Sequence, residues 1–504
     1  MKKFFLFLLS VYAFTFALHA QPSFIKDSLN SYIENGLKQW NIPGLAIAIV
    51  KDGKVVIMKG FGVSNLETKT PVDENTLFMI ASNSKLFTGT ALAQLEYNQK
   101  LSLNDKITQY FPDFKLYDKN ATEMVTIKDM LGHKIGTKTF QGDFSFWDAN
   151  ISRSEVMYKM RFLKPTGIFR QDYGYCNSCF LTAGEIIPKV TGKPWEVYVY
   201  DSFIKPLQMN NTSVLSRNME KMNQPATPYT TSFNPNIAAL PYDNIDNIAP
   251  AASIVSNVKD MSKWLMMQLD SGRYNGKQMI EWPVIRKTRD VITLLGSRKN
   301  GNSNFMGYGL GVFVRDYAGK QVYWHTGGAF GFVSNTCFIP EEKLGICILT
   351  NQDNQNFFEA LRLQIIDAYL NIPYRNKSEQ QLPSHLASLK KSQQEIAALQ
   401  ARVKGNFPSN IDINSFLGLY EHPIYGNIEI VKNTDKNLKV LFKNHPNLFA
   451  KLEYMDNNEW LLTYSNIVYG IFPTKFNIQN KKVLSVDIKA CDFVEYDSYI
   501  FIKK

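Results

Sequence analysis

Runs of residues that favour β-strands lie near both ends of the first 375 residues, and a long region of helical patterns separates them. The N-terminal runs, 44–50 and 54–62, flank Lys51-Asp52-Gly53, whose Asp-Gly step is typical of a β-hairpin turn. Four further runs follow much later in the chain, at 308–315, 321–325, 332–339 and 344–350. Strands at both ends of a helical region imply one sheet assembled from distant segments. We therefore predict an α/β (α+β) fold with an antiparallel sheet built from N- and C-terminal segments, flanked by helices, and an inserted helical subdomain. A cleft is expected where the two layers meet.

Apolar residues at helical spacing indicate where the helices lie. From Ser82 onward Ala91, Leu92 and Leu95 recur at helical intervals, residues 126–131 begin a second such segment, and an apolar helix is expected at 357–370. Between about residues 100 and 290, helical stretches alternate with loops rich in Pro and Asn.

The last quarter of the chain has a different composition. Residues 376–407 are polar, and a possible helix that ends at Gly405 carries Leu386, Leu389, Ile396 and Leu399. Beyond it apolar residues alternate with polar ones between Asn- and Asp-rich turns, which predicts a small antiparallel all-β domain. We divide the chain into a leader at 1–20, a main domain at 21–375, a linker at 376–410 and the β domain at 411–504.

The N-terminus has the organisation of a secretory signal peptide. Met1-Lys2-Lys3 precedes an apolar stretch, 4–18, and the small residue Ala20 comes just before Gln21. The alternative is an uncleaved membrane anchor, but the apolar stretch is short for a span of about 20 residues. We therefore expect a soluble protein that is periplasmic or secreted, with no stable membrane span after cleavage.

Charge argues against a nucleic-acid partner. The formal net charge is +11, or +9 once Lys2 and Lys3 are removed with the leader, and the remaining lysines are dispersed. The positive net charge would attract anionic polymers of the cell envelope.

Cysteine and histidine usage argues against a redox or metal centre. Five cysteines are too few for a disulfide scaffold, and Cys176-x-x-Cys179 lacks the strand and helix context of a thioredoxin-like pair. Cys337 and Cys347 flank a hairpin turn and could face each other, although two buried, unbridged thiols are favoured. Six histidines without an H-E-x-x-H motif leave no zinc site, and we expect no cofactor.

Ser82-Asn83-Ser84-Lys85 places a hydroxyl and an amine three residues apart at the start of a helix. Side chains at i and i+3 share a helix face, so the Lys85 amine can take the proton of the Ser82 hydroxyl if a desolvated, cation-rich site lowers its pKa. The same S-x-x-K spacing also begins at Ser23, Ser202, Ser256 and Ser388, so the spacing alone does not identify a nucleophile.

Two more motifs follow in chain order, Tyr175-Cys176-Asn177 and His325-Thr326-Gly327, the latter leading into Gly328. With these three motifs, residues 25–372 resemble the serine β-lactamase and penicillin-binding-protein superfamily, in the branch of class C β-lactamases, D-alanyl-D-alanine carboxypeptidases, D-aminopeptidases and related esterases. Supporting stretches are 131–136, 206–209 and 250–265. The stretch 411–504 is similar to an accessory β domain of this family that has no settled function.

The resemblance implies a role for each motif residue. Ser82 would be the nucleophile, and Lys85 and Tyr175 would share the task of base, with Tyr175 protonating the leaving group. Asn177 can bind a substrate carbonyl and steady Lys85, although Asn is equally common as a turn former. Thr326 and Gly327 would line the substrate site, and the backbone N–H groups of Ser82 and Gly328 would form an oxyanion hole. His133 is expected to be structural.

His325 stands where β-lactamases of this superfamily carry lysine, and Cys176 stands in place of serine. Because histidine is mostly neutral at pH 7, it would hold an anionic substrate carboxylate weakly. We therefore predict an exported serine hydrolase that acts through an acyl-enzyme, with D-amino-acid-containing peptides such as cell-wall stem peptides as preferred substrates. The alternatives are a small-acyl esterase, a β-lactamase, or a catalytically slow penicillin-binding or sensing protein.

Overall fold

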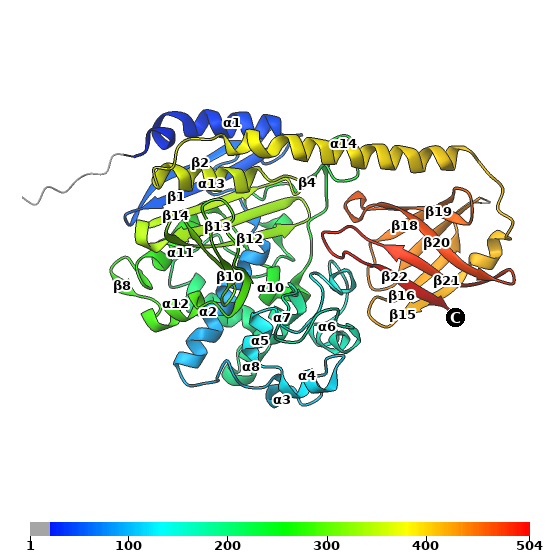
Figure 1. The fold of residues 1–504 in the computed structure, drawn as a ribbon, viewed down its shortest axis with the longest axis horizontal. Helices are drawn as coiled ribbons and strands as arrows, with labels where there is room; N and C mark the ends of the chain where they lie inside the picture. The colour runs from blue at the N-terminus through cyan, green and yellow to red at the C-terminus, as the bar shows by residue number, and fades with distance from the viewer. Residues whose placement is uncertain (1–20, 435) are drawn as a thin grey trace, which may run out of the picture.

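The computed structural model describes residues 21–434 and 436–504, and the predicted signal peptide at 1–20 lies outside the described residues. Its largest sheet has eight antiparallel strands, in the spatial order β2 (Lys54–Gly62), β1 (Gly44–Lys51), β14 (Leu344–Thr350), β13 (Phe332–Ile339), β12 (Lys320–Ala329), β11 (Phe313–Tyr317), β10 (Met306–Tyr308) and β9 (Thr293–Gly296). The N-terminal hairpin thus joins the C-terminal strands where β1 pairs with β14. The predicted sheet from distant segments is confirmed (Figure 1).

Alternating residue size along β1 explains how the sheet is covered on both faces. Leu45, Ile47 and Ile49 belong to the apolar cluster that contains α1 (Leu29–Gln39) and α13 (Phe357–Tyr369). The smaller Ala46 and Ala48 face the opposite side, where α11 (Val258–Leu269) packs against β1 and β14. Because side chains alternate between faces along a strand, β1 separates two helical layers.

The sequence-based prediction of one strand at 308–315 is wrong. The chain turns back on itself there, so Tyr308 ends β10 and Phe313 begins β11. Gly311 has a φ of +82°, and a Cβ atom on it would lie 2.2 Å from the carbonyl oxygen of Lys85. A glycine is needed at this turn because it passes directly over the backbone of the helix that begins at Ser84.

Cys337 and Cys347, which could have faced each other across two strands, do not. Cys337 pairs with Ile346, whereas Cys347 pairs with Thr336, so the two thiols are offset by one residue. An offset of one residue points them to opposite faces of the sheet. All five cysteines are buried and free, as the interpretation as unbridged thiols predicts.

The remaining helices of residues 21–375 include several that pack against α2 (Ser84–Tyr97), which follows a short 3₁₀ turn, Ala81–Asn83. The helices are α3 (Ile107–Tyr110), α4 (Lys119–Met124), α5 (Ile127–Leu131), α6 (Arg153–Lys159), α7 (Asn177–Gly184), α8 (Ile186–Thr191), α9 (Trp195–Val199), α10 (Ala249–Ala252) and α12 (Trp282–Arg289). Three two-stranded sheets pair β3 (Phe78–Met79) with β6 (Val255–Ser256), β4 (Tyr229–Thr230) with β5 (Ala238–Ala239), and β7 (Arg273–Tyr274) with β8 (Lys277–Gln278).

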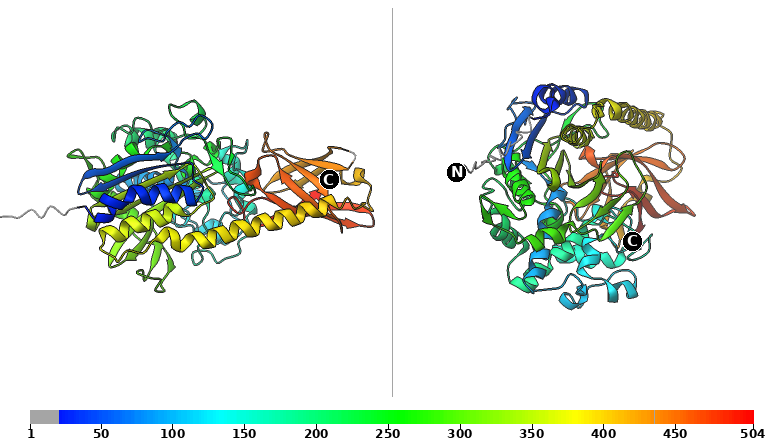
Figure 2. Two further views of the ribbon diagram at one scale, coloured as in Figure 1. Left: turned by 90° about the horizontal axis from the view of Figure 1, so that it is seen from above. Right: turned by 60° about the vertical axis from the view of Figure 1, so that its left-hand side comes forward.

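The segment interpreted as a linker is largely one long helix, α14 (Lys377–Lys404). It runs from the large sheet to the C-terminal strands along one side of the molecule (Figure 2). Ile396, Leu399 and Val403 pack against Met455, Leu461 and Ile471, and Arg402 forms ion pairs with Asp456 and Glu459.

Within the described residues, no helix combines the length and apolarity needed to cross a membrane.

The C-terminal strands form a closed eight-stranded barrel in which each strand pairs with its neighbours in the chain and the last pairs with the first. The strands are β15 (Gly418–His422), β16 (Gly426–Lys432), β17 (Asn437–Phe442), β18 (Phe449–Tyr454), β19 (Glu459–Tyr464), β20 (Ile471–Gln479), β21 (Lys482–Lys489) and β22 (Ser498–Lys503). Leu438, Val440 and Phe442 are buried while the residues between them are not, so the alternation predicted from the sequence is the inward and outward alternation of a barrel wall.

Candidate active site

Ser82 lies in the 3₁₀ turn that leads into α2 and is only partly buried. The residue before it, Ala81, has a φ of +47°, a left-handed conformation that L-residues other than Gly, Asn and Asp adopt rarely. The turn is held from both sides, because Asn83 Nδ2 donates to Ser334 Oγ at 2.8 Å and the backbone N–H of Ile254 donates to Ser84 Oγ at 3.0 Å. The Ser82 hydroxyl is therefore presented on a strained, fixed turn.

Lys85 is fully buried, and its amine lies 3.1 Å from Ser82 Oγ. The same nitrogen donates to Asn177 Oδ1 at 2.7 Å and to the carbonyl oxygen of Ala251 at 2.9 Å. Burial lowers the pKa of Lys85 to about 7, against the opposing effects of Asp143 and Cys176. A neutral amine has two N–H bonds, which the two oxygen acceptors take, so its lone pair is left facing the Ser82 hydroxyl.

Tyr175 lies over Lys85, with the amine 4.7 Å from the centre of its ring. Burial raises the pKa of Tyr175 well above its ordinary value, although a hydrogen bond with Ser82 acts in the opposite direction. The phenol is therefore protonated at neutral pH, and Lys85 is the group that titrates near neutrality.

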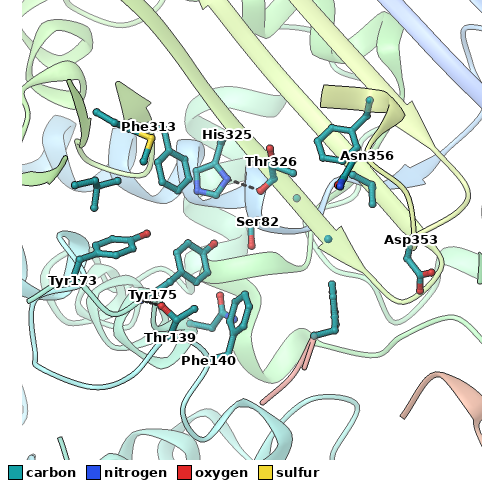
Figure 3. Close-up of a pocket in the computed structure, with 18 of the residues that line it drawn as sticks. Ser82, Thr139, Phe140, Tyr173, Tyr175, Phe313, His325, Thr326, Asp353 and Asn356 are labelled. Atoms are coloured by element: carbon teal, nitrogen blue, oxygen red, sulfur yellow. Dashed lines mark hydrogen bonds between the residues drawn. The ribbon is translucent and has the colours of Figure 1, made fainter. Parts of the chain in front are cut away.

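His325, on β12, is buried and uses both ring nitrogens in hydrogen bonds. Nδ1 lies 2.8 Å from the carbonyl oxygen of Thr326, which can only accept, so Nδ1 carries the proton (Figure 3). Nε2 consequently accepts from the Tyr308 hydroxyl at 3.0 Å. Burial and the nearby Lys85 lower the pKa of His325 to about 3, so the ring is neutral at physiological pH.

His133 lies behind the site rather than in it. Its ring packs 4.4 Å from that of Tyr175, and its Nδ1 accepts from the backbone N–H of Cys176 at 3.0 Å. Its pKa is lowered well below its ordinary value by burial, so a neutral ring supports the tyrosine.

Gly327 and Gly328 bring β12 close to the Ser82 turn. A Cβ atom on Gly327 would lie 2.0 Å from the carbonyl oxygen of Ile80, so no larger residue fits without movement. This contact places the part of β12 that carries Gly328 beside the start of α2. An oxyanion hole formed by the N–H groups of Ser82 and Gly328 would require this placement.

These residues open into one cleft of about 830 Å³, and Figure 3 shows Ser82, Tyr175, His325 and Thr326 around a common space. Asn177 also lines it. Six of the lining residues are aromatic side chains outside the motifs: Phe140, Trp147, Tyr173, Phe313, Phe358 and Phe493. Phe493 comes from the loop between β21 and β22, so the C-terminal barrel supplies part of the wall.

The cleft is short of positive charge. Within the described part of the chain, no lysine or arginine side chain is among the residues that line it, whereas Asp172 and Asp353 are. Asp353 Oδ2 accepts from the backbone N–H of Gly331 at 2.9 Å, and its Oδ1 is buried. Burial raises the pKa of Asp353 to about 6. Among residues 21–434 and 436–504, no group of three or more His, Cys, Asp or Glu side chains is arranged to hold a metal ion.

Several residues of the site have no sequence signal that could have found them. Tyr308, Asp143, Asp353 and Phe493 belong to no short motif and reach the cleft or its supports only through the fold. The apolar and aromatic composition of their surroundings is ordinary for a protein core, so only the three-dimensional arrangement distinguishes them.

Comparison with known proteins agrees with this geometry. Protein flp of Staphylococcus aureus (strain MRSA252) is 27% identical over 346 residues, covering 68% of this chain and 66% of that protein. Unguisins hydrolase ungD' of Aspergillus campestris (strain IBT 28561) is 25% identical over 440 residues, covering 81% of this chain and 78% of that protein. The structure of an octameric penicillin-binding protein homologue from Pyrococcus abyssi matches with a TM-score of 0.61 at 21% identity, covering 94% of this chain and 99% of that chain, which shows a shared fold.

The family resemblance drawn from the three motifs is confirmed over most of the chain. The sequence model of the family described as Beta-lactamase matches residues 29–370, which contain Ser82, Tyr175 and His325. This chain therefore belongs to the Beta-lactamase family, within the superfamily of serine β-lactamases and penicillin-binding proteins.

Proposed function

We propose that the protein is a serine hydrolase that cleaves amide or ester bonds through a covalent acyl-enzyme on Ser82. The observation that carries this proposal is the buried Lys85 amine, 3.1 Å from Ser82 Oγ, whose pKa is lowered to about 7. An amine with this pKa is partly neutral at physiological pH and can accept the serine proton.

In the acylation step, the proton of Ser82 Oγ passes to Lys85 as Oγ bonds to the substrate carbonyl carbon. The carbonyl oxygen takes the negative charge and is stabilised by the N–H groups of Ser82 and Gly328. The bond to the leaving group then breaks, Tyr175 donates its proton to that group, and Lys85 returns its proton to Tyr175. Ser82 is left as an ester.

In the deacylation step, water attacks the ester carbonyl and gives its proton to the pair formed by Lys85 and Tyr175. The bond between Oγ and the acyl carbon breaks, the proton returns to Oγ, and the product acid is released. Asn177 and the neutral His325 hold the geometry but exchange no proton in this scheme.

The preferred substrates are D-amino-acid-containing peptides or amides with a free amine near the cleaved bond. The neutral His325 and the absence of lysine and arginine from the described cleft lining offer little to a substrate carboxylate, whereas the two acidic residues of the lining, Asp172 and Asp353, favour an ammonium group by their charge. This favours a D-aminopeptidase-like reaction over a DD-carboxypeptidase or β-lactamase reaction, because substrates of the latter two present carboxylates. The aromatic cleft also suits uncharged acyl esters, and a small-acyl esterase is the second candidate.

A labelling experiment tests the chemistry. The purified protein is incubated with a fluorophosphonate or a labelled penicillin, and a mass adduct is expected on the wild type and lost in Ser82→Ala. No adduct with either reagent would refute the hydrolase proposal and favour a binding or sensing protein. An adduct retained in Ser82→Ala would refute the nucleophile.

A substrate panel then separates the classes. D-aminoacyl amides, D-Ala-D-Ala peptides, p-nitrophenyl esters and a chromogenic cephalosporin are compared by kcat/KM, and the first group is expected to be cleaved fastest. A preference for the D-Ala-D-Ala peptides or the cephalosporin would contradict the assignment from cleft charge.

We also propose that the protein is periplasmic or secreted, where cell-wall stem peptides are available, on the strength of its N-terminal sequence. Intact-mass measurement of the protein from its native host is expected to show a chain that begins near Gln21. A chain retaining Met1 to Ala20 would contradict this localisation.

A further inference from the structure

Residues 140–150 connect the catalytic cleft to the C-terminal barrel. Phe140 and Trp147 line the cleft, Asp143 points toward Asn177, and Phe144 enters the barrel. The short turn Asp143–Ser145 follows Gly142, whose φ of +89° lets the chain change direction between these contacts.

Phe144 is 1% exposed and lies among aromatic side chains of the barrel. Its ring stacks against His445 at 4.9 Å and against Tyr499 at 5.9 Å between ring centres. Four further barrel rings approach within 6.4 Å, those of Tyr425, Phe442, Tyr464 and Tyr469. A side chain of the hydrolase domain thus forms part of the core of the barrel.

The barrel also holds the backbone of residues 140–150 at four points. Glu495 Oε2 accepts from the N–H of Gly142 at 2.5 Å, and His445 Nε2 donates to the carbonyl oxygen of Phe144 at 2.9 Å. The Tyr469 hydroxyl donates to the carbonyl oxygen of Trp147 at 3.4 Å, and the N–H of Asn150 donates to the carbonyl oxygen of Asn444 at 2.7 Å. Contacts at both sides of Asp143 leave it little freedom to move.

Asp143 is the residue of this segment that reaches the catalytic machinery. It is 1% exposed, and its Oδ2 accepts from Asn177 Nδ2 at 2.5 Å. Because the Asn177 amide gives its N–H to Asp143, its oxygen must face the amine of Lys85, which it contacts at 2.7 Å. A flipped amide would instead present N–H groups to the amine, and a hydrogen bond from Lys85 would be lost.

We infer that Asp143 is a positioning residue that fixes the Asn177 amide and through it Lys85, and that the C-terminal barrel keeps Asp143 in place by holding Phe144. The inference rests on the proposed function, because it assigns the barrel a role in the acylation step. The barrel is then a structural part of the active site rather than an independent module.

Full-length variants test this inference through the rate at which a fluorophosphonate phosphonylates Ser82 with loss of fluoride, a step that requires removal of the same Ser82 proton as acylation. Asp143→Ala removes the contact with Asn177, and acylation is expected to slow roughly 100-fold, the loss typical of a misplaced catalytic group. Phe144→Ala leaves Asp143 in the sequence but removes its anchor, and roughly tenfold slower acylation is expected. The matched control is Phe233→Ala, which removes a ring that contacts Phe472 of the barrel away from the cleft; it is expected to acylate at the wild-type rate.

The pH dependence of acylation separates positioning from general destabilisation. Asp143→Asn keeps an oxygen that can accept from Asn177. Burial raises the pKa of Asp143 well above its ordinary value, and the ionised form of Asp143 raises the pKa of Lys85. Because the variant has no ionised form at this position, the midpoint of the acidic limb is expected to move to lower pH and not to higher pH. The other titratable groups around this pair are Cys176, Cys179, Tyr175, Tyr425, His133, His325 and Glu495. The charge of Asp143 also raises the pKa of Tyr175, Cys179 and Tyr425, but burial is the largest cause of each of these shifts and is kept in the variant. A variant that only loosened the fold would lower the rate without moving the midpoint.

Wild-type rates, within threefold, in both Asp143→Ala and Phe144→Ala would overturn the inference. If the wild type itself formed no adduct, the proposed function would fail, and the crystal structure of Asp143→Ala would decide the positioning role. A displaced Asn177 amide would support it, and an unchanged contact between Asn177 and Lys85 would overturn it.

Discussion

The burial of Lys85 predicts how acylation should depend on pH. A lysine with its ordinary pKa of 10.5 has roughly 1 in 3,000 of its amines neutral at pH 7, whereas one with a pKa of about 7 has about half of them neutral. The difference corresponds to about 5 kcal/mol, which is the order of the desolvation cost that the fold imposes on the protonated amine. The protein thereby holds a base that would otherwise be almost entirely protonated.

Acylation should therefore rise with pH up to about 7 and then level off. Because only neutral Lys85 can accept the Ser82 proton, the rate at pH 5 is expected to be about 100-fold below the plateau. Single-turnover labelling with a fluorophosphonate between pH 5 and pH 9 measures this rate directly, without interference from deacylation. A rate that stayed flat over this range would refute the assignment of Lys85 as the base.

Lys85→Arg tests the same reasoning by substitution. Arginine keeps its proton at every pH in this range, so the acylation rate is expected to fall at least 1,000-fold across the whole profile. Lys100→Arg, at an exposed lysine shortly after α2, is the matched control and should label as the wild type does. Labelling of Lys85→Arg within tenfold of the wild type would show that the amine is not needed as a base.

Three further predictions concern stability, selectivity and packing. Burial raises the pKa of Glu495 from 4.5 to about 7, so its contribution to stability is present below pH 4.5 and is lost as the pH rises to about 7. In thermal unfolding between these pH values, Glu495→Gln should lose about 3 kcal/mol less stability than the wild type, and parallel curves for the two proteins would contradict this. Asp353→Asn should lower kcat/KM for D-aminoacyl amides by about tenfold, because it removes one of the two carboxyl groups of the cleft lining, and leave p-nitrophenyl esters unchanged; an equal loss on both substrates would show that the charge of Asp353 does not select for the amine. Gly327→Ala should cost about 1 to 3 kcal/mol in chemical denaturation and slow acylation, because its Cβ would lie 2.0 Å from a backbone oxygen, whereas Gly296→Ala, which meets nothing within 4 Å, should change neither.

The strands that the sequence predicted best are those rich in β-branched and other apolar residues between clear turn signals. The predicted strands 332–339 and 344–350 coincide with β13 and β14, whose residues are buried along their whole length. The predicted strand 308–315 was wrong because its glycines lie at a turn set by the nearby backbone of Lys85, a contact between residues more than 200 positions apart. Closure of the C-terminal strands into a barrel likewise depends on the pairing of β15 with β22, which no local pattern encodes.

The active site also combines contacts that the local sequence predicts with contacts that it does not predict. Ser82 and Lys85 are neighbours on one helix face, so their spacing predicts their contact, and the structure places the two atoms 3.1 Å apart. The link from Asn177 to Asp143 joins residues 34 positions apart, and the contact of Phe144 with His445 joins residues 301 positions apart. Such contacts follow from the packing of whole domains, so they could not be predicted from motif spacing.

The length of the helix α14 determines how the C-terminal barrel is rotated relative to the hydrolase domain. Its 28 residues span about 42 Å, and the face that carries Ile396, Leu399 and Val403 must meet the barrel for the helix to be fixed at that end. One residue inserted near its start would turn that face by about 100° and advance it by about 1.5 Å. The length of this helix can therefore vary only in steps that keep both ends in register.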